Sequence, residues 1–237
     1  MKAILLAGGR GTRISRMIQD VPKCTLPIGN IPLIRLTVEK LIKRGFEVIV
    51  CVGYRHEIVE DDLKGLKVKF FYNPFYAVTN SIGTLWFARE ELNDDLLIMN
   101  ADVYFDDIIL DSLMKSDYEV VMASDITRVK TGDYFFLTRD DDCITKYGKE
   151  LPLEQRTGEY VGMAKIAKKF ASDFKDRIIK LVSEGDYNLW WENSLYSYVE
   201  EGKDIHTLDV NGAFWAEVDY FDDYERILKH VKEGDKK

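Results

Sequence analysis

The sequence predicts an α/β fold, in which a doubly wound, mostly parallel sheet is followed by a second half of different construction. Two observations lead to this prediction. Short apolar segments alternate with helical segments over about residues 1–125, as expected for parallel strands joined by right-handed crossovers. A glycine-rich loop directly follows the first apolar segment, and α/β proteins bind ligands at such a strand end.

The elements of the first half follow from their side-chain patterns. Strands are expected over the apolar runs 2–6, 47–52, 67–72, 96–99 and 119–123. A helix is expected over 32–44, because Leu33, Leu36 and Leu41 form a helical stripe that begins after a proline. Two more helices are expected over 57–64 and over 81–91, where Ser81 can serve as the cap.

The second half mixes strands, turns and helices. Strands are expected over 134–138 and 160–164, on either side of the turn-rich stretch "RDDDCITKYGKE", and later in "IHTLDV" and "AFWAEV". Helices are expected over 167–183, 187–200 and 220–232. Since no low-complexity linker or internal repeat interrupts the chain, we expect a single domain over residues 1–237.

Composition excludes several classes of protein. The chain has 237 residues, and its 46% hydrophobic content is enough for a sizeable core. Its net charge of −8 argues against general binding of nucleic acids, which needs a basic face. The three scattered cysteines predict neither a disulfide framework nor a zinc site. Since there is no signal peptide and no apolar stretch near the roughly 20 residues that span a bilayer, we expect a soluble cytoplasmic protein without membrane partners.

The loop "LLAGGRGTR", residues 5–13, lies in a basic part of an acidic chain. No acidic residue precedes Asp20, whereas Arg10, Arg13 and Lys23 lie within or near the loop. The loop lacks the lysine of a P-loop and the third small residue of a dinucleotide fingerprint. Glycines allow backbone N–H groups to approach phosphate oxygens, and Arg13 can add a bidentate contact. An anion site is therefore expected, with a tight strand-to-helix turn as the alternative.

This loop and the later segment "PKCTLPIGNIPLI" together resemble the signature of the nucleotidyltransferases that make NDP-sugars and CDP-alcohols. The resemblance implies a Rossmann-like, mostly parallel sheet with helices on both faces and a smaller substrate-binding subregion. It implies a nucleotide-binding half over about 1–125 and an acceptor-binding half over about 126–237. Arg13 and Lys23 would face the triphosphate as the catalytic residues. The nucleotide-binding residues that it implies are Leu6, Ala7, Gly8, Gly9, Gly11, Thr12, Arg13, Lys23, Tyr76, Asn80, Ser81 and Asp102.

Two aspartates follow apolar segments in a way that suits a metal site. Asp102 follows the run 96–99, and Asp219 follows "AFWAEV". Mg²⁺ prefers oxygen ligands, and on a triphosphate it needs only one or two protein carboxylates. The resemblance implies that Asp102 and Asp219 share this metal, and the alternative for each is a cap of a turn or helix. The competing carboxylates are Glu217, Asp106 and Asp107.

Two aromatic segments bear on the identity of the substrates. Tyr76, Asn80 and Ser81 are closer to the pattern of cytidylyltransferases for phosphocholine and similar small phosphates than to that of the sugar enzymes. Alternatively, Asn80 and Ser81 only begin a helix. Aromatic faces beside a carboxylate suit a cationic amine, although an aromatic stripe of this kind commonly packs into a core. The acceptor-binding residues expected are Trp190, Trp191, Glu192, Trp215 and Glu217.

These residues and the resemblance predict a Mg²⁺-dependent cytidylyltransferase. It would convert CTP and a small phosphorylated alcohol or amine, phosphocholine-like or amino-acid-derived, to the CDP derivative and pyrophosphate. We expect a monomer or homodimer whose product serves cell-surface polysaccharide biosynthesis. The alternatives are a sugar-1-phosphate nucleotidyltransferase and a non-catalytic nucleotide-binding regulatory subunit. The presence of Arg13, Lys23, Asp102 and Asp219 together argues against the regulatory subunit, because a sensor need not keep both metal carboxylates.

Overall fold

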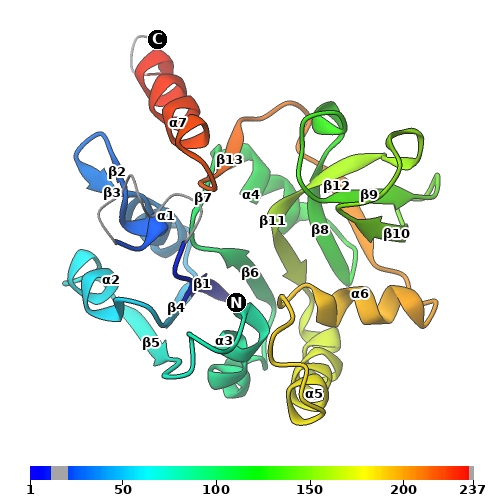
Figure 1. Cartoon of the computed structure of the whole chain (residues 1–237), viewed down its shortest axis with the longest axis horizontal. Helices are drawn as coiled ribbons and strands as arrows, with labels where there is room; N and C mark the ends of the chain where they lie inside the picture. Colours follow the sequence, from blue (N-terminus) through cyan, green and yellow to red (C-terminus); the bar gives the residue numbers. More distant parts are fainter. Residues whose placement is uncertain (12–20, 235–237) are drawn as a thin grey trace.

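The computed structural model describes residues 1–11 and 21–234. In this part of the chain, nine strands form one sheet, with helices packed around it (Figure 1). Four strands run parallel in the order β5-β4-β1-β6. Their bounds are Lys2–Ala7 for β1, Glu47–Val52 for β4, Val68–Tyr72 for β5 and Leu96–Asn100 for β6.

The rest of the sheet mixes strand directions. β11 (Gly158–Ile166) runs antiparallel to β6, to β8 (Val120–Asp125) and to β9 (Phe135–Thr138). β10 (Ile144–Gly148) pairs with β9, and β12 (His206–Asp209) runs parallel to β8. Strands from both halves of the sequence therefore share one sheet, because β11 lies directly beside β6.

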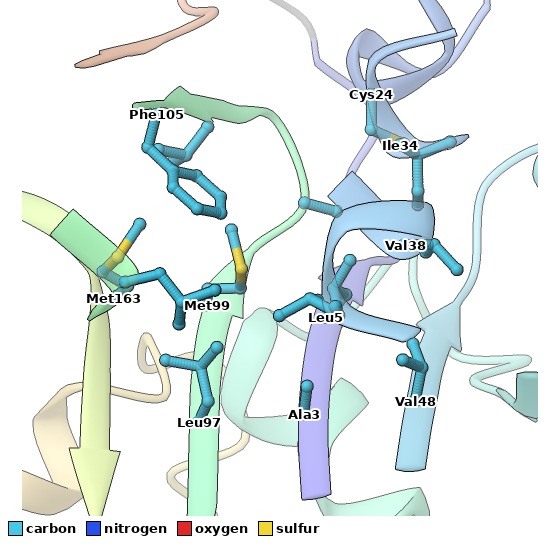
Figure 2. Packing of buried hydrophobic residues seen from close by; sticks show 14 of the residues in the cluster. Ala3, Leu5, Cys24, Ile34, Val38, Val48, Leu97, Met99, Phe105 and Met163 are labelled. Carbon is cyan, nitrogen blue, oxygen red and sulfur yellow. The ribbon is translucent and has the colours of Figure 1, made fainter. Parts of the chain in front are cut away.

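Helices cover both faces of this sheet. Their bounds are Leu33–Lys43 for α1, His56–Asp62 for α2, Ser81–Phe87 for α3, Asp107–Lys115 for α4, Lys168–Ser183 for α5, Asn193–Glu200 for α6 and Phe221–Gly234 for α7. Every residue of β1 is buried, with Leu5 packed among residues of α1 and α4 and Ile4 among residues of α3, α5 and α6. Figure 2 shows the first of these clusters, in which Leu5 and Val48 lie near Val38. An unbroken apolar run is what a strand between two helical layers needs, because successive side chains point to opposite faces.

The predicted α/β class and the elements of the first half are confirmed, but one predicted helix is wrong in its first part. The helix expected over 187–200 begins only at Asn193, and residues 187–192 form turns. The carbonyls of Tyr187 and Leu189 instead accept hydrogen bonds from the backbone N–H groups of Asn80 and Ile82, at 2.9 and 3.3 Å. These bonds satisfy backbone N–H groups at the start of α3, because the first N–H groups of a helix have no carbonyl partner within the helix.

Several short elements were not predicted. α4 was missed, as were β10 inside the turn-rich stretch and the hairpin of β2 (Pro27–Ile28) with β3 (Ile31–Pro32). β7 (Val103–Phe105) was missed as well, and it pairs antiparallel with β13 (Trp215–Glu217). None of the helices in the described ranges is long and apolar enough to cross a membrane.

Candidate active site

A cavity lies where the order of the parallel strands reverses. β4 and β5 follow β1 on one side, whereas β6 lies on its other side. Ligands of α/β proteins bind beyond the carboxyl ends of the strands at such a switch point. The cavity measures about 330 Å³, and its walls include the glycine loop after β1 and the residues after β6.

This cavity brings together most of the residues that the sequence singles out. The expected residues that line it are Leu6, Ala7, Gly8, Gly9, Gly11, Lys23, Tyr76, Asn80, Ser81, Asp102, Trp190, Glu192, Glu217 and Asp219. Thr12 and Arg13 lie outside the described residues. The sequence analysis did not anticipate Asn100, Asp133, Tyr134, Lys149, Tyr160 and Tyr196, which also line the cavity.

Glycines are needed where the loop packs against its neighbours. Gly11 has a φ of +58°, and a Cβ on it would lie 2.8 Å from Cγ of Lys23. Gly53, just after β4, packs on the loop itself, because a Cβ there would lie 2.7 Å from the carbonyl oxygen of Gly8. The N–H of Tyr54 also donates to that oxygen, at 3.2 Å. The backbone of the loop is therefore held against the end of β4.

Lys23 forms an ion pair with two carboxylates in the cavity. It begins a 3₁₀ turn, Lys23–Thr25, directly after Pro22. Its Nζ donates to the Asp219 carboxylate and lies 3.8 Å from Oδ2 of Asp102. Burial lowers the pKa of this ammonium, but the two carboxylates outweigh burial and raise the pKa above its usual value. Lys23 is therefore protonated at neutral pH and can neutralise an anion here.

The two aspartates meet because of the small β7–β13 sheet. Asp102 lies between β6 and β7, and Asp219 follows β13. The pairing sets Val103 opposite Glu217, and the N–H of Val218 donates to the carbonyl oxygen of Asp102 at 3.0 Å. Carboxylates about 120 residues apart in the sequence thus reach one point beside the glycine loop.

Glu217 is a third carboxylate in this group. Burial raises its pKa well above the usual value, and the charges of Asp102 and Asp219 raise it further. The Nδ2 group of Asn100, the last residue of β6, donates to Oε1 of Glu217 at 3.3 Å. Burial therefore favours the protonated form of Glu217, whereas Asp102 and Asp219 share the Lys23 ammonium.

Asn80 and Ser81 begin α3 as well as lining the cavity. Oδ1 of Asn80 accepts from the N–H of Ser81 at 2.8 Å, as an N-cap does, and Oγ of Ser81 accepts from the N–H of Trp191 at 2.9 Å. The alternative that Asn80 and Ser81 only begin a helix thus explains the hydrogen bonds that their side-chain oxygen atoms accept. No described residue accepts a hydrogen bond from Nδ2 of Asn80 or from the Ser81 hydroxyl, so both can still donate to a ligand.

Aromatic residues from the second half form the other end of the cavity, here called the acceptor end. Tyr134 stacks on Tyr196, with centroids 5.5 Å apart, and meets Trp190 edge-on at 5.9 Å. Glu192 lies beside them and is only 6% exposed. Burial raises the pKa of Glu192 to about 7. This end of the cavity is thus apolar on its ring faces and holds a carboxyl group that titrates near neutrality.

Two of the expected acceptor residues lie elsewhere. Trp191 is fully buried, and its Nε1–H donates to Oδ1 of Asn100 at 3.1 Å. Trp215 is 5% exposed, and its Nε1–H donates to Oδ2 of Asp125 at 2.8 Å. Neither lines the cavity, which corrects the expected placement of both rings. A large ring with one N–H donor is stabilised in the interior when a buried acceptor takes that hydrogen bond.

Comparisons with known proteins show the family of the chain and its likeness in sequence and fold to other proteins. The family described as MobA-like NTP transferase domain matches residues 3–160. The chain is 26% identical over 235 residues to choline-phosphate cytidylyltransferase of Streptococcus pneumoniae, covering 98% of this chain and 99% of that protein. It is 26% identical over 250 residues to CTP:phosphoglutamine cytidylyltransferase of Campylobacter jejuni, covering 95% of this chain and 98% of the relative. The solved structure of the S. pneumoniae CTP:phosphocholine cytidylyltransferase (LicC) superimposes with a TM-score of 0.78 at 25% identity, over 97% of this chain and 98% of the other.

Proposed function

Because the chain belongs to the family of MobA-like NTP transferase domains and is a nucleotidyltransferase, we propose that it transfers the cytidylyl group of CTP to a small phosphorylated alcohol or amine. Two relatives that match it over nearly their whole lengths are both named as cytidylyltransferases. The observation that carries the proposal is the Lys23 ammonium between Asp102 and Asp219, beside a glycine loop at the switch point. We treat residues 1–237 as one domain whose halves bind nucleotide and acceptor.

The reaction that suits this site is a displacement at the α-phosphorus of CTP. An oxygen of the acceptor phosphate forms a bond to that phosphorus, the bond to the bridging oxygen breaks, and pyrophosphate leaves with the electron pair. The acceptor phosphate is already ionised near neutral pH, so no protein group has to remove a proton. Catalysis then depends on positioning and on charge neutralisation, to which the Lys23 ammonium contributes. The same role is proposed for Arg13.

Mg²⁺ is the divalent cation proposed for this site, and the residues present suit it. Asp102 and Asp219 supply hard oxygen ligands within reach of one ammonium group. Among the described residues, no group of three or more His, Cys, Asp or Glu side chains is arranged to hold a metal ion without a nucleotide. Two carboxylates are enough for Mg²⁺ on a nucleotide, because phosphate oxygens and water complete its shell. When bound, the ion withdraws negative charge from the phosphates.

The nucleotide is proposed to lie between the glycine loop and the start of α3. Backbone N–H groups of Gly8, Gly9 and Gly11 would face the phosphates, and Asn80 and Ser81 would donate to the edge of the cytosine ring. Tyr76, which lines the same wall, would border the base or ribose. The proposal includes a cytoplasmic reaction whose product serves the decoration of the cell surface.

Pyrophosphate release tests this proposal directly. The full chain with Mg²⁺ is given each of the four ribonucleoside triphosphates in turn. Each is combined with phosphocholine, phosphoethanolamine, O-phosphoserine or a sugar 1-phosphate. Turnover with CTP and a non-sugar phosphate is expected. Turnover confined to sugar 1-phosphates would establish the alternative enzyme, and nucleotide binding without pyrophosphate release would establish a regulatory subunit.

A further inference from the structure

An ion pair at the acceptor end of the cavity has no part in the phosphate chemistry proposed above. Nζ of Lys149 lies 2.5 Å from Oδ2 of Asp133, and both residues line the cavity. The same ammonium lies 5.4 Å from the ring centroid of Trp190, within the range of a cation–π contact. A cationic acceptor group that approached this ring would therefore meet a cation of the chain.

Both members of the pair are attached to ordered structure. The backbone N–H of Asp133 donates to Oε1 of Glu159 at 2.8 Å, and Glu159 is only 5% exposed. Lys149 follows directly after β10, where Tyr147 stacks on Tyr196 with centroids 4.2 Å apart. Asp133 is thus held by β11 and Lys149 by the end of β10, and both side chains line the cavity.

The charges in the cavity decide which acceptor fits. Among the described residues that line it, the cations are Lys23 and Lys149. Lys23 is bound to Asp219 beside the glycine loop, so Lys149 is the cation at the acceptor end. A quaternary ammonium without a carboxylate would compete with Lys149 for Asp133 and would lie close to the Lys149 ammonium. A carboxylate would instead make a charge-assisted hydrogen bond to Lys149.

We propose that the acceptor carries an amino-acid group, with its carboxylate on Lys149 and its ammonium on Asp133. This inference rests on the proposed cytidylyl transfer and specifies the class of acceptor. An acceptor with only a carboxylate would draw Lys149 away and leave Asp133 without its cation. An acceptor with only an ammonium would draw Asp133 away and leave Lys149 without its anion. A zwitterion replaces the ion pair between these partly exposed side chains by two charge-assisted pairs with the ligand, so that every charge keeps a partner.

Three matched acceptors test the inference. O-phosphoserine carries both charged groups, phosphoethanolamine lacks the carboxylate, and 3-phosphooxypropionate lacks the ammonium. With CTP, the kcat/KM for O-phosphoserine is expected to exceed that of each of the others by about tenfold or more, as for a lost charged hydrogen bond. Lys149→Met should lower kcat/KM for O-phosphoserine by about tenfold without lowering that for phosphoethanolamine. Lys149→Arg should keep the preference.

Lys146→Met is the matched control, because Lys146 lies on the same strand and donates to Gln155 instead of lining the cavity. It should leave the order of the three acceptors unchanged. Equal use of O-phosphoserine and phosphoethanolamine, or equal losses on both in Lys149→Met, would overturn the inference and leave cytidylyl transfer intact. If no nucleotide supports turnover, the proposed function fails instead. Calorimetric binding of the same compounds then decides: a preference for O-phosphoserine that Lys149→Met abolishes supports the inference, and its absence refutes it.

Discussion

The indole N–H of Trp191 donates to Oδ1 of Asn100 at 3.1 Å, although 91 residues separate the two in the sequence. Asn100 ends β6, and its Nδ2 group donates in turn to Glu217. Trp191 follows a turn whose carbonyls accept from the start of α3. The Asn100 side chain thus connects Trp191, next to the acceptor end of the cavity, to β6, the strand that precedes Asp102.

Trp191→Phe should therefore destabilise the protein. The substitution keeps most of the buried ring but removes the donor to Asn100, whose partly buried side chain then loses this hydrogen bond. We expect a loss of about 1–3 kcal/mol in the free energy of unfolding, measured by urea denaturation. Trp190→Phe is the matched control, because Trp190 is 40% exposed and should lose clearly less. Equal losses in the two variants would contradict the structural role of the Trp191 bond.

Gly53→Ala should destabilise the loop that faces the proposed nucleotide. The added Cβ would lie 2.7 Å from the carbonyl oxygen of Gly8, which as backbone cannot move aside easily. We expect a loss of about 1–3 kcal/mol in the free energy of unfolding, together with weaker CTP binding. Gly9→Ala serves as the control for stability, since a Cβ there meets nothing within 4 Å. It should change stability by no more than about 0.5 kcal/mol, and a larger loss would mean that the clash at Gly53 is not the cause.

Local signals in the sequence predicted much of the fold and the position of the candidate residues. β1 is an unbroken apolar run, and the loop after it carries its own glycine pattern. Asp102 and Asp219 each follow an apolar segment, and the strand ends of the fold bring both to Lys23. Their roles with nucleotide and metal stay predictions, as does the role of Arg13.

The acceptor end could not be derived in this way. Trp190 and Trp191 are adjacent, yet one is 40% exposed and lines the cavity while the other is fully buried. The sequence predicted one helix over 187–200 that would contain both residues. Instead, hydrogen bonds to the start of α3 hold residues 187–192 in turns. The partner residues of those bonds are about 110 positions away in the chain, so no window of local sequence contains the information. The pair Lys149–Asp133, whose members are 16 residues apart, was missed because the pairing of β9 with the unpredicted strand β10 brings them together.

Lys23→Ala should abolish most of the turnover. It removes the ammonium that touches Asp219 and lies near Asp102, and with it the positive charge that faces the departing pyrophosphate in the proposed reaction. We expect kcat to fall by about 10²–10³-fold, as for the loss of one positioned electrostatic contact. Lys40→Ala is the control, because Lys40 pairs with Asp107 away from the cavity. A Lys23→Ala enzyme with unchanged kcat and raised KM would show that Lys23 only binds the ground state.

Glu192→Gln should change how the stability of the protein depends on pH. Burial raises the pKa of Glu192 to about 7, whereas an exposed glutamate titrates near 4.5. Between these values the folded state holds a proton that the unfolded state releases, so the stability of the wild type falls as the pH rises from about 4.5 to 7. Glutamine cannot ionise and avoids this loss. At pH 5 the two proteins should unfold at similar urea concentrations, whereas at pH 8 the variant should be the more stable, by at most about 3 kcal/mol. A difference that does not change between these two pH values would show that Glu192 does not titrate in this range.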